Sequence, residues 1–377
     1  MRYWRFGKTN LNLSIFSLGT MRCLASSSEF QHIVRKALSL GINHIETARG
    51  YGKSEEYLGQ TLTLGLPFPR DRFYITTKLP PTPDEETMRS QIDESLERLK
   101  LDYLDCLAIH GINTRKHLAW LQSDRGFMKA VEEAKKAGKI RYIGFSTHAP
   151  LDIIVAAIET NLFDFINLHY YYFFQQNKPA IALAQKKDMG VFIISPVDKG
   201  GQLYVPPDTL KELCQPLSPL EFNYRFLLSD RRITTLSFGA AKLEDFQSIG
   251  NVCDRDEDLT PEENKIRDRL ENRLRETLGT DLCSQCHLCL PCPEKINIPE
   301  VLRLRNLTLA YEMKSFGEYR YQMFENAGHW FPGRKGDRCT DCGDCLPRCP
   351  EKLDIPKLLR DTHNRLNGKP RRRLWSS

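Results

Sequence analysis

Eight of the twelve cysteines lie close together near the C-terminal end of the sequence. They form two motifs in which three thiols recur at every third residue and a Cys-Pro pair follows. The motifs are Cys283-x2-Cys286-x2-Cys289-x2-Cys292-Pro293 and Cys339-x2-Cys342-x2-Cys345-x3-Cys349-Pro350. A disulfide framework is typical of a small secreted chain, and a chain of 377 residues does not fit that class. Clustered thiols in such a chain indicate a metal site instead.

The spacing of these thiols favours iron–sulfur clusters. Three thiolates at every third residue wrap one face of a cubane cluster, and a fourth thiolate from elsewhere completes the ligand set. In two-cluster ferredoxins the fourth cysteine comes from the other motif, so we expect two [4Fe–4S] clusters, with Cys349 closing the first and Cys292 the second. Two zinc sites are the alternative, although zinc ligands are more often pairs of cysteines separated by a loop. Because the thiols complete the ligand count, we expect His287 to lie behind the ligands or in solvent.

The first 250 residues alternate short apolar runs with longer amphipathic stretches, which predicts alternating strands and helices. The expected strands span residues 15–20, 43–48, 73–78, 104–111, 141–147, 165–170, 191–196 and 234–240. The expected helices include 29–40, 85–99, 127–137, 152–161 and 179–188. Eight strands separated by helices are the pattern of a (β/α)8, or TIM, barrel. A doubly wound sheet would alternate too, but the sequence has neither a GxGxxG turn after an early strand nor a GxxxxGK[ST] motif.

A second domain follows the predicted barrel. The sequence becomes acidic and loses its periodicity at 251–259. Thr260 as N-cap, Pro261 at the first helical position and Glu263 then predict the start of a helix. Each cysteine motif is followed by an Ile-Pro step at which another helix is expected to begin. This second domain is therefore predicted to be small, mainly α-helical and similar to a two-cluster ferredoxin.

These patterns divide the chain into three parts. We expect the TIM barrel over residues 1–255, the ferredoxin-type helical domain over 256–368, and a basic, disordered tail over 369–377. The formal net charge is +6, and the tail carries four of these charges, on Lys369, Arg371, Arg372 and Arg373. The remainder of the chain is close to neutral, so no nucleic-acid partner is expected.

Hydropathy excludes two further classes. No uncharged apolar run approaches the length of a membrane span. The N-terminal residues lack the apolar stretch of a signal peptide. We therefore expect a cytoplasmic protein with no membrane partner.

Ionisable residues lie at the ends of three consecutive predicted strands. In a (β/α)8 barrel the chemistry takes place at the carboxyl ends of the strands. Glu46 lies near the end of the second strand, Lys78 ends the third and His110 lies near the end of the fourth. Tyr51 lies in the loop that follows Glu46. We expect these four residues to meet at one rim of the barrel as the catalytic group.

Together they predict proton transfer to a carbonyl oxygen. A tyrosine has an ordinary pKa of about 10 and can protonate that oxygen while hydride reaches the carbon. An adjacent lysine lowers the pKa of the tyrosine, and a carboxylate holds the lysine in place. The histidine can orient the carbonyl group through a hydrogen bond.

The segment Gly41-Ile-Asn-His-Ile-Glu-Thr-Ala-Arg-Gly-Tyr-Gly-Lys-Ser-Glu-Glu-Tyr-Leu-Gly59 resembles the signature of the aldo-keto reductase family. The resemblance extends from Arg2 to about Ala241, and the cysteine-rich end is similar to the subgroup with a C-terminal 4Fe–4S ferredoxin module. It implies a Tyr/Lys/His/Asp tetrad, matched here by Tyr51, Lys78, His110 and Glu46. It also implies a nicotinamide cofactor, usually NADPH, bound without a Rossmann fold.

The same resemblance implies a set of cofactor-binding residues. Ser146, within Gly144-Phe-Ser-Thr-His148, and Asn167 on the sixth strand match the residues that bind the carboxamide. Ser195 lies at the matching end of the seventh strand. Gly239 and Lys242 match the phosphate-binding loop after the eighth strand, where the lysine meets a 2′-phosphate.

Three departures from the family pattern are visible. Glu46 stands where the family usually has Asp and is one methylene longer. Ile194 stands where an aromatic residue usually stacks on the nicotinamide. The usual Arg and Asn beyond the phosphate loop are not evident.

The expected function is NAD(P)(H)-linked reduction or oxidation of a small carbonyl or alcohol substrate by an iron–sulfur oxidoreductase. Hydride from NADPH already carries both electrons, so two clusters indicate exchange with a one-electron partner such as ferredoxin or flavodoxin. Two alternatives remain open. One is an electron-transfer or binding protein whose barrel does not catalyse, and the other is a conventional reductase whose clusters are structural or regulatory.

Overall fold

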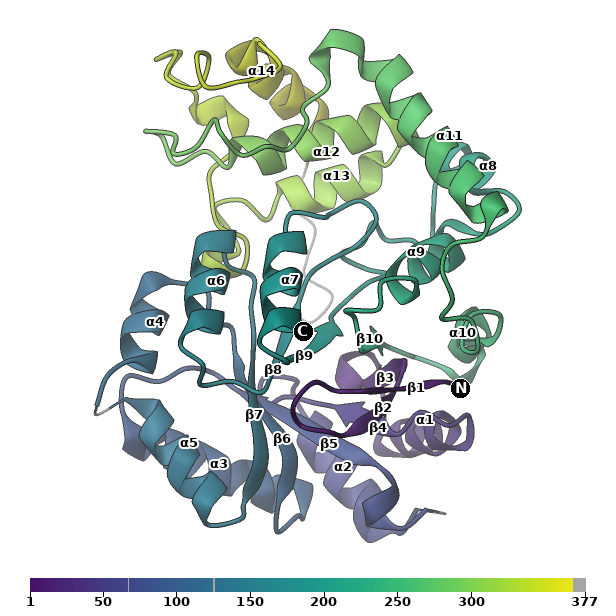
Figure 1. The fold of residues 1–377 in the computed structure, drawn as a ribbon, viewed down its shortest axis with the longest axis vertical. Helices are drawn as coiled ribbons and strands as arrows, with labels where there is room; N and C mark the ends of the chain where they lie inside the picture. Colours follow the sequence, from purple (N-terminus) through teal and green to yellow (C-terminus); the bar gives the residue numbers. More distant parts are fainter. Residues whose placement is uncertain (67, 125, 369–377) are drawn as a thin grey trace. The chain divides into compact units, whose positions relative to one another are not determined.

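The computed structural model describes residues 1–66, 68–124 and 126–368, so the predicted basic tail lies outside the described residues. The chain forms two compact units. The first comprises residues 1–200 and 223–258, and the second comprises residues 201–222 and the chain from Leu259 onward. Figure 1 shows strands ringed by helices in the first unit and a group of helices in the second.

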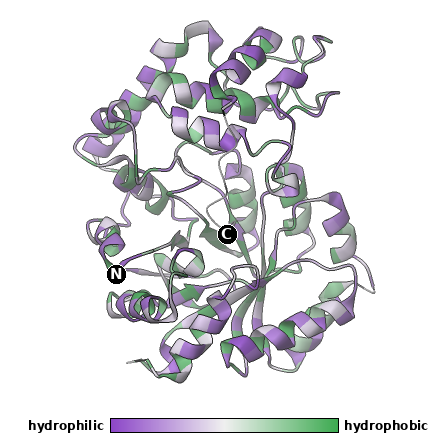
Figure 2. Cartoon of the chain, turned by 180° about the vertical axis from the view of Figure 1, so that it is seen from behind, coloured by the Kyte–Doolittle hydropathy of each residue, from purple (hydrophilic) through white to green (hydrophobic). Residues whose placement is uncertain are grey.

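The first unit is a closed barrel of eight parallel strands in the order β10-β3-β4-β5-β6-β7-β8-β9. Each predicted strand overlaps one strand of this barrel, which confirms the predicted fold class. The strands are β3 (Phe16–Gly19), β4 (His44–Glu46), β5 (Tyr74–Leu79), β6 (Leu104–His110), β7 (Ile140–Ser146), β8 (Phe165–Leu168), β9 (Gly190–Ile193) and β10 (Thr235–Phe238). Figure 2 shows these strands as mainly hydrophobic and most of the helices around them as a mixture of hydrophobic and hydrophilic residues.

Helices connect successive strands, and the five predicted helices are confirmed. They are α1 (Ser27–Ser39), α3 (Glu85–Leu99), α5 (Phe127–Lys136), α6 (Leu151–Glu159) and α7 (Lys178–Lys186). The pattern missed α2 (Ser54–Thr63), α4 (Arg115–Leu121), α9 (Pro219–Leu228) and the single turn α10 (Gln247–Gly250). Side chains cap several of these helices, since Ser26, Asp84 and Thr114 each accept a hydrogen bond from the backbone of the first turn.

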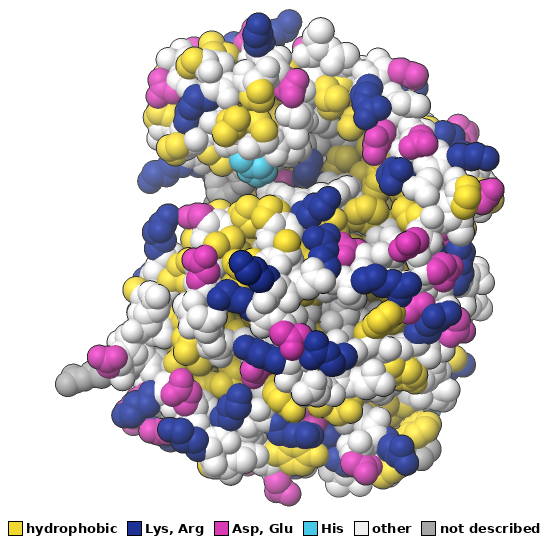
Figure 3. All heavy atoms as spheres, in the orientation of Figure 1, with side chains coloured by type: hydrophobic (Ala, Val, Ile, Leu, Met, Phe, Trp, Pro, Cys, Tyr) yellow, Lys and Arg dark blue, Asp and Glu magenta, His cyan; other side chains and the backbone are white. Residues whose placement is uncertain are grey.

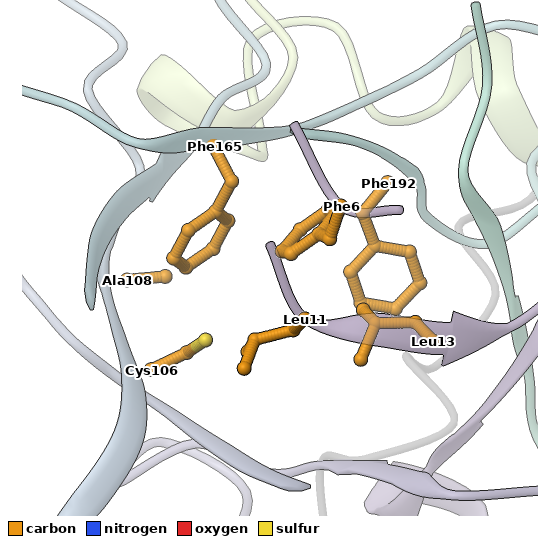
Figure 4. Close-up of a cluster of buried hydrophobic side chains, with 7 residues drawn as sticks. All are labelled: Phe6, Leu11, Leu13, Cys106, Ala108, Phe165 and Phe192. Carbon is orange, nitrogen blue, oxygen red and sulfur yellow. The ribbon is translucent and has the colours of Figure 1, made fainter. Parts of the chain in front are cut away.

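A hairpin that the sequence did not reveal precedes the barrel. It pairs β1 (Tyr3–Arg5) with β2 (Asn12–Ser14) in antiparallel fashion. Phe6 from its loop is fully buried in a cluster with Leu11 and Leu13 of the same hairpin and with residues of β6, β8 and β9, namely Cys106, Ala108, Phe165 and Phe192 (Figure 4). The rings of Phe6 and Phe165 lie 5.1 Å apart. A Cβ atom on Gly190 would come within 2.2 Å of the Phe6 ring, so this contact requires glycine.

A fully buried histidine links four strands inside the barrel. His44 on β4 bonds through Nδ1 to Ser17 Oγ at 2.7 Å and through Nε2 to Thr76 Oγ1 at 2.7 Å. Ser17 Oγ in turn lies 2.8 Å from Thr235 Oγ1. Burial, and secondarily the charge of Lys78, lowers the pKa of His44 to about 3. The imidazole is therefore neutral in the folded protein at neutral pH.

The second unit is built mainly from helices. They are α8 (Asp208–Cys214), α11 (Pro261–Leu278), α12 (Ile298–Tyr311), α13 (Lys314–Tyr321) and α14 (Ile355–Leu366). The predicted cap of α11 is confirmed, because Thr260 and Glu263 form a reciprocal capping box. The inserted helix α8 joins this unit through α11, where Arg269 donates to Leu213 O at 2.9 Å.

The two cysteine motifs are followed by matching helix starts. Both α12 and α14 begin at an Ile-Pro step, as predicted. Asn297 caps α12 and Asp354 caps α14, each by accepting a hydrogen bond from the backbone three residues later. The two cysteine motifs, each followed by an Ile-Pro step, are therefore repeated in structure as well as in sequence.

The surface carries mixed charge. On the face in Figure 3, Lys and Arg side chains are interspersed with Asp and Glu. Among the described residues, no helix combines the length and the apolar character needed to cross a lipid bilayer.

The buried imidazole of His44 predicts a dependence of stability on pH. An unfolded histidine has a pKa of about 6.5, so unfolding at a lower pH takes up a proton that the folded barrel excludes. The stability that His44 contributes is complete above about pH 6.5 and falls as the pH drops toward 3. Urea unfolding at several pH values should show that His44→Gln reduces this loss by up to about 1.4 kcal/mol per pH unit.

His32 provides the control, because it is exposed on α1. His32→Gln should leave the pH dependence unchanged. Equal pH dependence in the wild type and the His44→Gln variant would contradict the assignment of a buried, neutral His44.

Candidate functional site

Three of the four candidate catalytic residues lie on adjacent strands of the barrel. Glu46 is the last residue of β4, and Lys78 lies one residue before the end of β5. His110 is the last residue of β6. Tyr51 lies in the turn between β4 and α2, where its backbone N–H donates to Ala48 O at 3.0 Å. The parallel register therefore brings these side chains to the carboxyl rim.

Lys78 and Glu46 form a buried ion pair. Lys78 Nζ lies 2.9 Å from Glu46 Oε1, and the two side chains are 2% and 3% exposed. Lys78 also donates to Thr47 O at 3.0 Å, and Asn167 Nδ2 donates to Glu46 Oε1 at 2.6 Å. The longer side chain of Glu46 thus reaches the lysine. Burial alone would lower the pKa of Lys78, but the charge of Glu46 raises it, so the ammonium keeps its proton.

Tyr51 and His110 lie beside this ion pair. Lys78 Nζ is 4.7 Å from the centre of the Tyr51 ring, and the rings of Tyr51 and His110 meet edge to face at 5.8 Å. Burial raises the pKa of Tyr51, and the neighbouring Lys78 offsets this only in part. Burial, Lys78 and Lys199 lower the pKa of His110 to about 3. At neutral pH the site therefore presents a protonated phenol beside a neutral imidazole.

Two buried polar atoms on the neighbouring strands lack hydrogen-bond partners. Ser146 ends β7 and pairs in register with Asn167 on β8. Ser146 Oγ and Asn167 Oδ1 are both buried, and neither has a partner among the described residues. A buried polar group is normally satisfied. A carboxamide such as that of nicotinamide can donate to both oxygens, so these residues fit the cofactor implied by the sequence.

The remaining candidate cofactor residues lie on loops at the same end of the strands. Ser195 follows β9 and has a left-handed backbone conformation, with φ of 52°. Gly239 follows β10, and Lys242 is exposed three residues later. The side chain of Arg22 packs over Gly239, since a Cβ atom there would lie 3.2 Å from Arg22 Cδ. The sequence analysis did not single out Arg22.

A second polar network lies at the ends of β7, β8 and β9. His169 Nε2 is 3.2 Å from His148 Nε2, and Lys199 Nζ is 3.3 Å from the same atom of His148. His169 Nδ1 contacts the hydroxyl of Tyr171, which donates to Ile194 O at 2.5 Å. The charge of Lys199 also helps to lower the pKa of His110, one of the candidate catalytic residues. The sequence analysis missed His169, although it directly follows β8.

The eight clustered cysteines surround two hollows in the second unit. Each hollow has three thiols from one motif and a fourth from the other. One is lined by Cys283, Cys286, Cys289 and Cys349, and the other by Cys339, Cys342, Cys345 and Cys292. This is the grouping that the exchange of fourth ligands requires.

The walls of both hollows suit a multi-atom cluster. Leu302 and Ile355 add apolar surface to the first hollow, and Ile298 and Leu359 to the second. Among the described residues, no three His, Cys, Asp or Glu side chains converge closely enough to hold one metal ion. Four thiols spread around a space instead match a cubane, whose iron atoms are bound by thiolates on several sides.

Two family models match the chain. The model of the aldo/keto reductase family matches residues 16–205, and that of the 4Fe-4S dicluster domain matches residues 282–353. The first covers half of the chain and most of the barrel. The second covers both cysteine motifs.

Individual relatives match part of the chain. The oxidoreductase YqkF of Bacillus subtilis is 24% identical over 281 residues, which cover 65% of this chain and 88% of that protein. L-galactose dehydrogenase of Arabidopsis thaliana is 32% identical over 204 residues, which cover 50% of this chain and 62% of that enzyme, less than two thirds of its length.

Solved structures show the same fold. The holo form of aldo-keto reductase AKR11C1 from Bacillus halodurans superposes with a TM-score of 0.62 and 23% identity, covering 71% of this chain and 96% of that one. The barrel, the match to the family model and the cysteine-rich unit agree with one another. The chain belongs to the aldo/keto reductase family and carries a 4Fe-4S dicluster domain beyond its barrel.

Proposed function

We propose that this oxidoreductase uses NADP(H) to interconvert a carbonyl compound and its alcohol at the rim formed by Tyr51, Lys78, His110 and Glu46. The observation that carries the proposal is the buried Lys78–Glu46 ion pair beside the Tyr51 ring. The ion pair places a fixed positive charge next to a phenol that keeps its proton at neutral pH. A general acid held in this way matches the protonation step of carbonyl reduction.

Each residue has a defined part in this mechanism. A nicotinamide held here would supply hydride for the carbonyl carbon. Tyr51 donates its phenolic proton to the carbonyl oxygen, and the positive charge of Lys78 stabilises the phenolate that remains. Glu46 keeps Lys78 charged and in place. His110 is neutral and orients the carbonyl oxygen with a ring N–H, and Tyr51 regains its proton from solvent.

The cofactor is proposed to bind along the ends of β7 to β10. Ser146 and Asn167 offer two buried oxygens without partners, which suits the carboxamide. Ser195, Gly239 and Lys242 belong to loops at the same end of the barrel, and the exposed ammonium of Lys242 suits the 2′-phosphate of NADP(H).

The substrate is proposed to be a hydroxylated compound. Two relatives are enzymes named for sugars, L-galactose dehydrogenase and D-arabinose 1-dehydrogenase. His148, His169 and Lys199 supply several polar atoms near His110. Hydroxyl groups of a sugar can exchange hydrogen bonds with such a network.

The dicluster domain is proposed to hold two [4Fe–4S] clusters and to exchange single electrons with a partner such as ferredoxin or flavodoxin. The eight cysteines are proposed as the ligands, four to each hollow. Hydride chemistry alone needs no such clusters. A soluble one-electron carrier would therefore exchange electrons with the clusters and link this protein to a further redox reaction.

Nicotinamide binding is the first test. In an anaerobic titration of the cluster-loaded protein, NADPH fluorescence should show saturable binding in the micromolar range. Ser146→Ala removes one hydrogen-bond partner worth about 1 kcal/mol, so the dissociation constant should rise roughly fivefold. Ser39→Ala is the control, because Ser39 is exposed at the end of α1. No saturable binding of NADPH or NADH would contradict the proposed function.

The proton donor is the second test. Tyr51→Phe removes the hydroxyl and should lower kcat for NADPH-dependent reduction of 4-nitrobenzaldehyde by about 10²- to 10⁴-fold, with NADPH affinity unchanged. Tyr57→Phe removes a hydroxyl from the adjacent helix α2 and should retain activity. If Tyr51→Phe turns over as fast as the wild type, Tyr51 is not the proton donor.

A further inference from the structure

His287 has a buried nitrogen with no partner at the edge of a cysteine-lined hollow. It follows Cys286 and lines the hollow formed by Cys283, Cys286, Cys289 and Cys349. Its Nε2 atom is buried and makes no hydrogen bond to any described residue. A buried polar atom without a partner is unfavourable, and in the tautomer that carries its proton on Nε2 this nitrogen is a donor that lacks an acceptor.

The surroundings of His287 limit the kind of acceptor. Four thiols and apolar side chains such as Leu302 and Leu353 form most of the wall. Ser284 and Glu351 also reach the hollow, and both are exposed residues. Sulfur is therefore the acceptor that a cluster in this hollow would offer to the imidazole.

Gln285 already makes such a bond in the same motif. Its Nε2 donates to Cys283 Sγ at 3.3 Å. Gln285 and His287 both have left-handed backbone conformations, with φ of 59° and 61°. Such values are uncommon for residues other than glycine. The chain thus keeps two side chains with N–H groups at positions where glycine would be less strained.

The second motif differs at both matching positions. Asp341 replaces Gln285 and has a similar φ of 56°, but it pairs with Arg360 at 2.6 Å. Gly343 replaces His287 and has a φ of 81°. A Cβ atom on Gly343 would contact only Leu346, at 4.0 Å, so the second motif has room for a side chain but lacks one. The two hollows are therefore alike in their thiols and different in their side-chain donors.

We propose that His287 donates its Nε2–H to a sulfur of the cluster in the first hollow and, together with Gln285, raises the reduction potential of that cluster. This rests on the proposed clusters. Reduction adds one electron from an external donor and makes the sulfurs more negative. A hydrogen bond to sulfur then becomes stronger, which favours the reduced state.

Charged residues also lie near both hollows. The informative comparison is therefore between the reduction potentials of the first cluster with and without its side-chain donors. Glu351 lines the first hollow, and Asp344 and Arg348 line the second. These charges stay in place when His287 is replaced. Any change in potential on replacing His287 is therefore attributable to the imidazole.

The test is an anaerobic redox titration of the full chain with its clusters, followed by EPR. His287→Phe keeps a ring but removes the N–H, and the equilibrium constant for reduction of one cluster should fall about tenfold, about 59 mV for one electron. The other cluster should not shift. Gln285→Leu should lower the potential of the same cluster, and His287→Gln, which keeps an N–H donor, should recover at least half of the change.

Controls distinguish a failure of this proposal from a failure of the proposed clusters. His329→Phe replaces an exposed histidine of the same unit and should change neither potential. Full iron content with unchanged potentials in His287→Phe, or an equal shift of both clusters, would overturn the proposal. A wild-type chain that holds no iron would instead overturn the proposed clusters.

A second measurement does not depend on the folding of a variant. In wild-type protein labelled with 15N-histidine, pulsed EPR of the reduced clusters should detect a weak nitrogen coupling. Absence of this coupling in iron-loaded protein would contradict the hydrogen bond.

Discussion

Two opposite charges are buried together at the carboxyl ends of β4 and β5, and their attraction must offset the cost of removing both from water. The hydrogen bond from Asn167 to Glu46 and that from Lys78 to Thr47 O help to meet this cost. The ammonium is therefore fixed in position, and the Tyr51 ring packs against it. Removing either charge would leave the other unpaired, a loss of about 3–5 kcal/mol in comparable buried pairs.

The residues one layer deeper in the barrel support this ion pair. Alternate residues of a barrel strand point into the interior. Glu46 and Lys78 each lie two residues beyond a member of the His44–Thr76 hydrogen bond. The strands that carry the charges are therefore tied together one layer deeper. The rim that carries the candidate catalytic residues depends on neutral, hydrogen-bonded polar groups in the barrel as well as on its apolar core.

The sequence predicted the parts of the structure that follow from periodicity and from spacing. Strands of apolar residues between amphipathic helices led to the barrel, and strand ends led to Glu46, Lys78 and His110. The hairpin β1–β2 was missed because Tyr-Trp-Arg and Asn-Leu-Ser do not form the apolar runs by which the barrel strands were recognised. The grouping of 201–222 with the second unit was also invisible, because it depends on contacts between distant segments.

Some residues of the candidate site could likewise be predicted from the sequence, and others could not. The rim residues could be found one strand at a time, whereas the network around His169 depends on three loops meeting in space. The unpartnered atoms of Ser146, Asn167 and His287 could not be found from sequence at all. A side chain without a partner is recognised only when all of its neighbours are known.

The exchange of cysteines between the two motifs makes the halves of the second unit interdependent. Cys349 belongs to the first hollow and Cys292 to the second, so neither set of four thiols exists within one motif alone. The first set of four thiols is complete only when the chain has been synthesised from Cys283 to Cys349, and the second only when it has been synthesised from Cys292 to Cys345. The two proposed clusters would therefore depend on each other, because loss of either one would free a cysteine of the opposite motif.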